Sequence, residues 1–235
     1  MLAVMALPMM VACGGDDSDD GDNIDTTPIS LKTDQDKTIQ GADTISSLNK
    51  FVAYGTKNVV HGWHVGETSL LVNGKNTISI TVLPQYNLYD DPICNWGCSM
   101  DYIKKNQKQG TINSKSTSEI LAYDNAGGAT LLAYEFKNDK LTGIVAMVST
   151  NHTSTLGKYL GERYLMTSYY KGDKEYFIGA DGLNEETIKT YVMLDLYNTN
   201  TWSVMYMNTE ISSTRSDIIS NESNEDLIQK IAQFM

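Results

Sequence analysis

The chain has 235 residues, of which 29 are acidic and 18 are basic, so its formal net charge is -11. A chain this acidic has no electrostatic attraction to the phosphates of DNA or RNA, and nucleic-acid binding is therefore not expected. Hydrophobic residues make up 41% of the chain, which is enough for a core, so we expect one large domain or two small ones rather than disorder throughout.

The acidic excess is concentrated near the N-terminus. Six aspartates lie within residues 16–25, and no lysine or arginine precedes Lys32. The chain after residue 27 therefore has 23 acidic and 18 basic residues, a net charge of -5. This charge is ordinary for a folded protein and predicts no particular partner.

Residues 1–12 form an apolar run that ends directly before Cys13. The run is too short for a helix that spans a hydrocarbon core of ~30 Å, but its length is typical of the apolar region of a signal peptide. The sequence Met10-Val11-Ala12-Cys13 resembles the lipobox of bacterial lipoproteins, in which the cysteine is lipidated and becomes the mature N-terminus. We therefore expect residues 1–13 to be a lipoprotein signal peptide and Cys13 to carry the lipid. A signal peptide begins with a positively charged region, which this run lacks, so we expect such a stretch upstream of Met1.

Residues 14–32 are rich in Gly, Asp, Ser and Thr and are expected to be a flexible acidic tether. Residues 14–20 resemble the acidic export signal that follows the lipidated cysteine in surface lipoproteins of Bacteroidetes. The resemblance implies an outer-membrane lipoprotein displayed on the cell surface, and a lipoprotein facing the periplasm is the alternative. The same aspartates match a calcium-binding loop only in part, because the later glutamate is missing, so no metal site is expected there.

From about residue 36 the pattern predicts short strands. Residues 51–54 and 69–72 are apolar runs, and residues 77–82 alternate apolar and polar side chains as a half-buried strand does. Asn73-Gly74 lies between two of these segments and is a strong hairpin signal. Pro84 is expected to end the last strand.

Spaced apolar residues and glycines in this region carry a family resemblance. They are Asn49, Val52, Ala53, Val60, Gly62, Gly66, Thr68, Leu70, Ile78, Ile80, Val82 and Pro84. Their pattern resembles a bacterial immunoglobulin-like (Ig-like) domain of group 2 and covers about residues 29–85. The resemblance implies an all-β Ig-like sandwich, which we assign to residues 33–85. It also implies that Gly66 makes a tight turn where a positive φ or a close approach excludes a Cβ.

Residues 86–235 are expected to form a second domain. Helices are predicted at about 98–108, with Ser99 as N-cap, at about 153–162, and at about 224–234, beginning at Ser223. Strands are predicted at 119–123, 129–136, 141–148, 163–170, 175–178, 188–196 and 201–207, and Asn138-Asp139 is expected to join two of them. The order is a helix followed by an antiparallel meander, given twice, which predicts an α+β fold.

This twofold order resembles the beta-lactamase-inhibitor-like fold of small secreted bacterial proteins. Trp96-Gly97 and the run Leu160-Gly161-Glu162-Arg163-Tyr164 are similar to segments of uncharacterised lipoproteins of gut Bacteroidetes. The resemblance implies a fold and a habitat, and it implies no activity. Within the run, Glu162 and Arg163 are expected to be an ion pair or a surface dyad.

The histidines do not predict catalysis or metal binding. His61 and His64 offer half of a zinc site at most, because on a strand or turn they point to opposite faces, and we expect them to be exposed loop residues. His152 lies near Ser149 and Ser154, but the chain has no G-x-S-x-G elbow, so these are expected to be polar residues at a helix start. No catalytic residue, metal or cofactor is therefore expected.

Cys94 and Cys98 bracket a predicted turn. They would pair as a disulfide in an oxidising compartment or stay as two buried free thiols, and a catalytic thiol is not expected because neither cysteine has an obvious histidine partner. The chain also has 14 tyrosines. Trp96, Tyr169 and Tyr170 are candidate binding residues, because aromatic side chains give a wide contact area at low entropic cost. The alternative is that the tyrosines fill the faces of strands.

These observations predict a non-catalytic cell-surface lipoprotein that is held at the outer membrane by a lipid anchor. An Ig-like spacer would present an α+β module that binds a protein or a glycan. One alternative is a secreted inhibitor or assembly subunit, which predicts an exposed aromatic face. Another is a carboxylate-dependent hydrolase, which predicts a deep pocket with two acids at a productive spacing.

Overall fold

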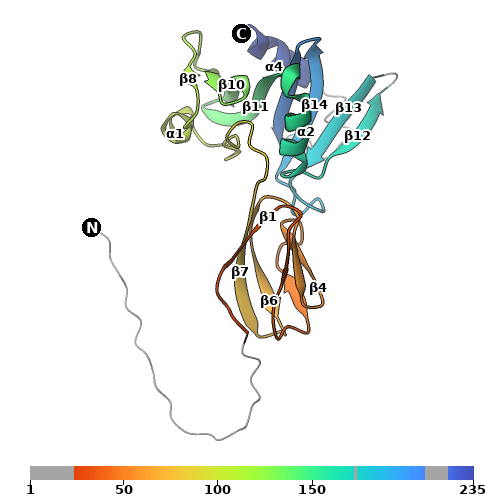
Figure 1. Ribbon diagram of the computed structural model, residues 1–235. Helices are drawn as coiled ribbons and strands as arrows, with labels where there is room; N and C mark the ends of the chain where they lie inside the picture. Colours follow the sequence, from red (N-terminus) through yellow and green to blue (C-terminus); the bar gives the residue numbers. More distant parts are fainter. Residues whose placement is uncertain (1–23, 172–173, 210–221) are drawn as a thin grey trace, which may run out of the picture.

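The computed structural model describes residues 24–171, 174–209 and 222–235 (Figure 1). Strands are its main secondary structure, which confirms the expectation of a β-rich chain. The strands form two bodies, one built from residues before Pro84 and one from residues after Pro92, joined by a single connecting segment. Among the described residues, none of the helices has the length and hydrophobicity needed to span a bilayer.

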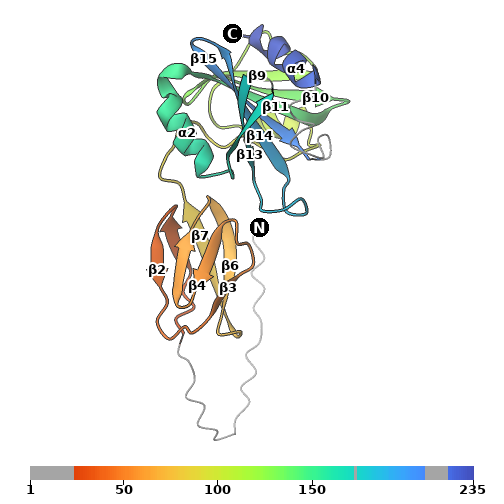
Figure 2. The ribbon, with the colours of Figure 1, turned by 90° about the vertical axis from the view of Figure 1, so that its right-hand side faces the viewer.

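The N-terminal body consists of two facing sheets (Figure 2). Their order is β1-β7-β6-β3 in the larger sheet and β2-β5-β4 in the smaller one. The larger sheet is antiparallel except for its first pair, because β1 runs parallel to β7. The strands are β1 (Ile29–Lys32), β2 (Asp36–Thr38), β3 (Ile45–Ser47), β4 (Ala53–Thr56), β5 (Val59–Gly62), β6 (Gly66–Val72) and β7 (Asn76–Leu83).

The core of this body lies between its two sheets and forms as the alternating pattern predicts. Ile78, Ile80 and Val82 of β7 point inward and are buried, whereas the residues between them face outward. Asn73 and Gly74 both have positive φ, at 50° and 69°, which confirms the hairpin between β6 and β7.

One correction concerns the start of the N-terminal body. β1 lies within residues 14–32, which the sequence analysis assigned to the tether, because Ile29 and Leu31 are buried in the core while Ser30 and Lys32 face outward. A four-residue alternation surrounded by polar residues is too short to stand out from a tether. Gly66 behaves as expected, since its φ is +150° and a Cβ there would lie 3.0 Å from Val52 Cγ2.

The C-terminal body is built on one eight-stranded antiparallel sheet, with the order β12-β13-β14-β15-β11-β10-β9-β8. Its strands are β8 (Thr111–Ile112), β9 (Ile120–Ala126), β10 (Ala129–Lys137), β11 (Lys140–Ser149), β12 (Thr167–Lys171), β13 (Lys174–Ala180), β14 (Thr190–Asn198) and β15 (Thr201–Asn208). Each half of the sheet is a meander of four consecutive strands. The two meanders meet through their last strands, where Val145 of β11 lies opposite Met205 of β15.

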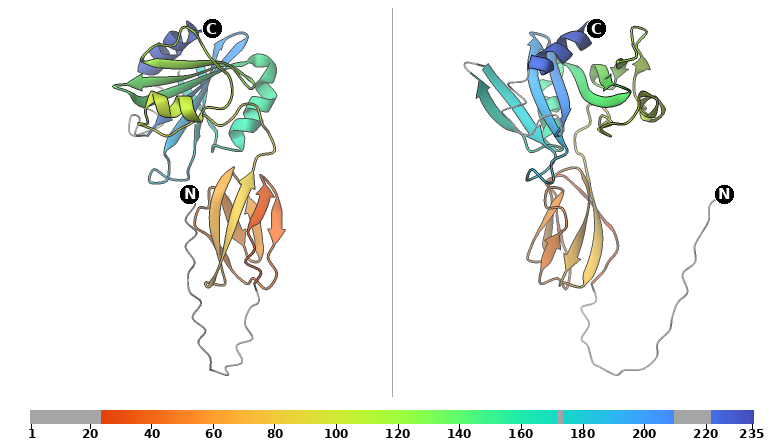
Figure 3. Two further views of the ribbon diagram at one scale, coloured as in Figure 1. Left: turned by 90° about the vertical axis from the view of Figure 1, so that its left-hand side faces the viewer. Right: turned by 180° about the vertical axis from the view of Figure 1, so that it is seen from behind.

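Helices cover both faces of this sheet. They are α1 (Met100–Asn106), the short 3-10 helix η1 (Thr150–His152), α2 (Thr153–Gly161) and α4 (Glu222–Ala232). Buried residues of α1 and α2 share one core with one face of the sheet, and buried residues of α4 share a second core with the other face. The views in Figures 2 and 3 show α2 and α4 on opposite sides of the sheet.

Two predicted element ends are wrong. The segment from Arg163 to Met166 continues the end of α2 as a turn, with the N–H groups of Arg163 and Tyr164 donating to Leu160 O, so the strand begins only at Thr167. α4 begins at Glu222, so Ser223 lies in its first turn and is not its cap. Both errors arise where a helix end leaves no periodic signal.

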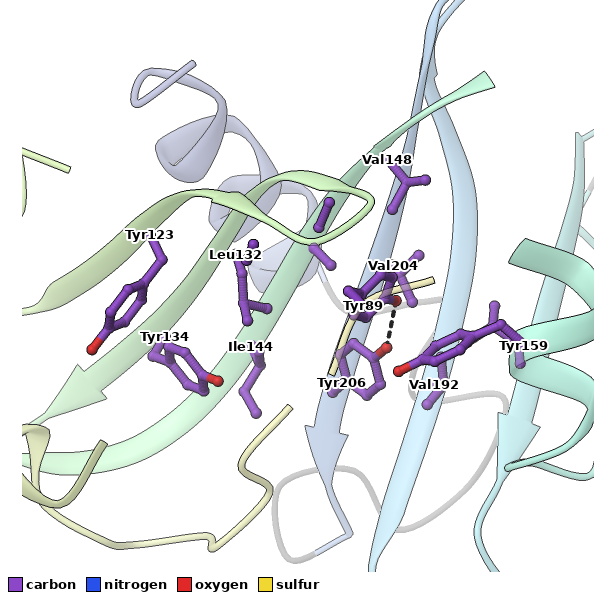
Figure 4. Packing of buried hydrophobic residues seen from close by; sticks show 14 of the residues in the cluster. Tyr89, Tyr123, Leu132, Tyr134, Ile144, Val148, Tyr159, Val192, Val204 and Tyr206 are labelled. Carbon is purple, nitrogen blue, oxygen red and sulfur yellow. Dashed lines mark hydrogen bonds between the residues drawn. The ribbon is translucent and has the colours of Figure 1, made fainter. Parts of the chain in front are cut away.

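Tyrosines fill much of the core on the α1 and α2 face. Figure 4 shows Tyr89, Tyr159 and Tyr206 together, and the Tyr89 and Tyr206 hydroxyls are hydrogen bonded at 2.7 Å. Burial raises the pKa of all three phenols above its ordinary value. Tyr206 on β15 and Tyr134 on β10 fill strand faces, as the alternative interpretation of the tyrosines expected, whereas Tyr89 and Tyr159 are core residues outside the strands.

Candidate functional site

The aromatic residues singled out from the sequence do not form one surface. Tyr169 and Tyr170 lie on the edge strand β12, 40% and 64% exposed, and as neighbours on a strand they point to opposite faces. Trp96 is partly buried and its Nε1 donates to Thr190 Oγ1 on β14 at 3.2 Å, two strands away from β12. Cys13 lies outside the described residues.

Cys94 and Cys98 are free thiols in the structure. Both pack against the core on the α1 and α2 face, and burial raises the pKa of the Cys94 thiol to about 12. Burial also raises the pKa of Cys98. A thiol with a raised pKa is a poor nucleophile at neutral pH. Pairing of the two cysteines under oxidising conditions stays a prediction.

The histidines near the N-terminal core differ from expectation. His64 was expected to be exposed, but it is only 2% exposed, because its ring stacks on Phe51 with the centroids 4.0 Å apart. Its Nδ1 lies 2.8 Å from Phe51 O, and burial lowers its pKa below 6.5. His61 is partly exposed and lies 2.6 Å from Asp36 Oδ1. His64 is thus a core residue, which a pattern of two histidines three positions apart cannot show.

An apolar groove lies beside α2 on the C-terminal body. Its volume is about 370 Å³, within the range of sites that bind small molecules or anchoring side chains. One wall is α2 and the other is the sheet. It is lined by Thr153, Leu156, Gly157, Leu160, Met166, Phe177, Leu194 and Trp202.

Gly157 keeps the helix wall of this groove open. It lies in the middle of α2, where glycine costs about 0.5–1 kcal/mol relative to alanine. No heavy atom lies within 4 Å of the position that its Cβ would take, so packing does not require a glycine there. A larger side chain at this position would project into the free space of the groove.

The groove has little capacity for polar recognition. Thr153 is its one lining residue with a polar side chain besides the indole of Trp202, and these two groups are already bonded, with Trp202 Nε1 donating to Thr153 Oγ1 at 2.8 Å. Phe177 is 36% exposed at the groove, and Leu196, the neighbour of Trp202 across β14 and β15, is 45% exposed. The groove therefore favours an apolar ligand surface over a polyhydroxylated one.

A second feature is the joint between the two bodies, which is built on Glu162 and Arg163. The Glu162 carboxylate accepts hydrogen bonds from Thr33 Oγ1, from the Gln85 N–H at 2.8 and 3.1 Å, and from the Tyr86 N–H at 2.9 Å. Its backbone oxygen accepts from the Val65 N–H at 2.8 Å. The side chains of Glu162 and Arg163 are both buried and lie within ion-pair distance, so the expected ion pair is present and the alternative of a surface dyad is wrong.

Arg163 ties the connecting segment to the end of α2. Its Nε donates to Asp91 Oδ1, and its Nη1 donates to Tyr159 O at 3.1 Å and to Tyr86 O at 3.4 Å. Its guanidinium lies 3.9 Å from the centroid of the Tyr159 ring, and the Tyr159 hydroxyl donates to Asp91 Oδ1 at 2.9 Å. Nη1 also lies 3.8 Å from Glu162 Oε2. The joint is thus a network of charge-assisted hydrogen bonds.

Two carboxylates, Asp90 and Asp91, line a cleft of about 280 Å³ next to this joint. Asp91 accepts from Arg163 and Tyr159, and Asp90 Oδ1 accepts from Gln109 Nε2 at 2.8 Å. These contacts hold the connecting segment in place and use the carboxylates as structural acceptors. Within the described ranges no group of three His, Cys, Asp or Glu side chains is arranged to hold a metal ion.

Comparison of the chain with protein-family models, with curated proteins and with solved structures found no match. Sequence reasoning missed the groove, because Phe177, Leu194 and Trp202 come from three strands whose order in the sheet no local pattern shows. Gly157 inside a predicted helix is a local signal at the groove, but Gly161 lies in the same predicted helix and does not line it.

Proposed function

We propose that the protein is a non-catalytic cell-surface lipoprotein whose C-terminal body binds a protein partner through the groove beside α2. The N-terminal body is an Ig-like sandwich that acts as a spacer, and the C-terminal body is an α+β module in which a helix and an antiparallel meander occur twice. Cys13 carries the lipid anchor in the outer membrane, and the acidic residues that follow it form the tether and export signal.

The observation that carries this proposal is the chemistry of the groove. The earlier expectation left a protein and a glycan open as ligands, and a glycan needs several hydrogen-bonding groups that the lining lacks. Apolar and aromatic side chains of a protein partner match the exposed Phe177 and Leu196. A protein ligand is therefore favoured.

A peptide-display selection against the full chain tests the proposal, with a glycan array as the competing assay. Peptides with apolar anchors should bind the unaltered protein. They should bind the Gly157→Leu variant at least tenfold more weakly, because the leucine side chain fills the groove. Gly161→Leu is the matched control, because Gly161 ends the same helix, has no heavy atom within 4 Å of its Cβ position and does not line the groove. Glycan binding that survives Gly157→Leu would contradict the proposal.

The anchor is tested separately. Cys13→Ala should release the protein from membranes, and added protease should digest the unaltered protein on intact cells if it is displayed outside. Protection from protease on intact cells, with digestion after the outer membrane is opened, would favour the periplasm-facing alternative.

A secreted inhibitor or assembly subunit is the second candidate, and the β12–β13 hairpin favours it. Tyr170 and Phe177 are exposed on the face of this hairpin that also borders the groove, and the Tyr170 hydroxyl donates to Glu175 Oε1 at 2.9 Å. Tyr170→Ala should weaken the binding of a partner that covers the hairpin. If the partner is confined to the groove, Gly157→Leu should weaken binding and Tyr170→Ala should not. A carboxylate-dependent hydrolase has less support, because Asp90 and Asp91 are engaged as structural acceptors.

A further inference from the structure

Apart from the groove, the two bodies and the segment between them are joined by hydrogen bonds that converge on Glu162. We propose that Glu162 is an orientation lock, whose carboxylate holds the N-terminal sandwich and the C-terminal body as one rigid unit. The lock and the groove lie in different places and involve different residues, so a test of the lock does not depend on the proposed ligand.

The contacts of Glu162 come from every part that would have to move. Thr33 follows β1 and belongs to the sandwich, whereas Gln85 and Tyr86 begin the connecting segment. Glu162 itself follows α2 in the C-terminal body. One side chain therefore joins the sandwich, the connection and the module, and a rotation of the module about the connection must break these bonds.

The chemistry of the joint requires a carboxylate. The hydroxyl and the two backbone N–H groups that bond to the Glu162 side chain are all donors, and the Arg163 guanidinium, 3.8 Å from Oε2, is a donor as well. A carboxylate is an acceptor only, so both of its oxygens match them. A glutamine of the same size would turn an NH₂ group toward a backbone N–H, which leaves donors facing donors in a buried place.

Three further contacts limit the remaining motion. The Val65 N–H, just before β6, donates to the backbone oxygen of Glu162. Leu165, three residues later, packs against the hydrophobic core of the sandwich. Gln85 Nε2 also donates to Thr33 O at 2.7 Å, so the connecting segment is bonded to the sandwich as well as to Glu162. The joint thus has apolar and hydrogen-bonded contacts on more than one side of the connection.

Distance measurement between spin labels tests the lock in the full chain. One nitroxide is placed at Lys75, in the β6–β7 turn of the sandwich, and one at Lys105, in α1 of the C-terminal body, both exposed positions. The labels are attached through an introduced ketone amino acid, so the native cysteines stay unlabelled. The unaltered joint should give one narrow distance distribution, and Glu162→Gln should at least double its width.

The second variant and two controls separate orientation from stability. Thr33→Val removes one donor from the sandwich side and should broaden the distribution less than Glu162→Gln does. Glu119→Gln, an exposed glutamate of the C-terminal body, should leave it unchanged, and so should Ile144→Val, which weakens the sheet core away from the joint. If Glu162→Gln does not fold, broadening by Thr33→Val decides the question.

The proposal is overturned if the distribution stays narrow in both joint variants, because the angle would then be set by other contacts. It is also overturned if Ile144→Val broadens the distribution as much as the joint variants do, because the motion would then follow from general loss of stability. Broadening confined to the two joint variants supports the lock.

Discussion

Replacing Gly157 by alanine should make the protein more stable, although the residue lies in the candidate binding groove. The middle of α2 has helical backbone, and glycine there costs about 0.5–1 kcal/mol relative to alanine, mostly through the larger conformational freedom of the unfolded chain. The added Cβ meets no heavy atom within 4 Å, so no steric term opposes the gain.

The whole gain should therefore appear in the free energy of unfolding, as a rise of about 0.5–1 kcal/mol, or of about 1–4 °C in Tm for a body of this size. Gly128→Ala, between β9 and β10, is the contrasting variant, because its Cβ would lie 2.8 Å from the backbone oxygen of Leu88, which cannot move aside as a side chain can. It should lower the stability by about 1–3 kcal/mol. Urea unfolding followed by tryptophan fluorescence measures both. A loss of stability in Gly157→Ala would contradict the open space beside Gly157 in the helix wall of the groove.

The remaining predictions concern buried polar groups. Burial lowers the pKa of His64, so the folded sandwich keeps this histidine neutral, and its contribution to stability is complete above pH 6.5 and is lost as the pH falls. The free energy of unfolding should therefore fall below pH 6.5 by at most about 1.4 kcal/mol per pH unit. His64→Gln should remove this pH dependence. The Cys94 thiol, with a pKa raised to about 12, should react with iodoacetamide at pH 8 more slowly than Cys98, and equal rates by peptide mass spectrometry would contradict its burial. Tyr206→Phe leaves the buried Tyr89 hydroxyl without its partner and should cost about 1–3 kcal/mol in chemical unfolding; a neutral substitution would mean that the hydroxyl pair contributes nothing.

The elements predicted well are those fixed by neighbouring residues. Asn138 and Asp139 both take positive φ in the turn between β10 and β11, as the short polar connection predicts. Ser99 caps α1 with its side chain accepting from the Tyr102 N–H, as expected. In each case the chemistry of two to four adjacent residues decides the conformation, and no distant contact is needed.

The features that the sequence did not predict depend on distant contacts. β11 and β15 pair at the centre of the large sheet although the whole second meander separates them in the chain, and this pairing places Trp202 beside α2. His64 is buried because Phe51 stacks on it, and Glu162 is buried because the sandwich and the connecting segment converge on it. The local sequence pattern therefore predicted the helix and the strands that form the candidate site, but not which of their residues come together there.

The parallel pairing of β1 with β7 has a mechanical consequence. A pull on the chain from the N-terminal side of Ile29 and from the C-terminal side of Leu83 draws these two neighbouring strands in opposite directions along their length. The hydrogen bonds between them are then loaded in shear and share the force at once, whereas a hairpin pulled at its open end is peeled one bond at a time. The sandwich should therefore resist traction along the chain more strongly than its thermodynamic stability alone suggests.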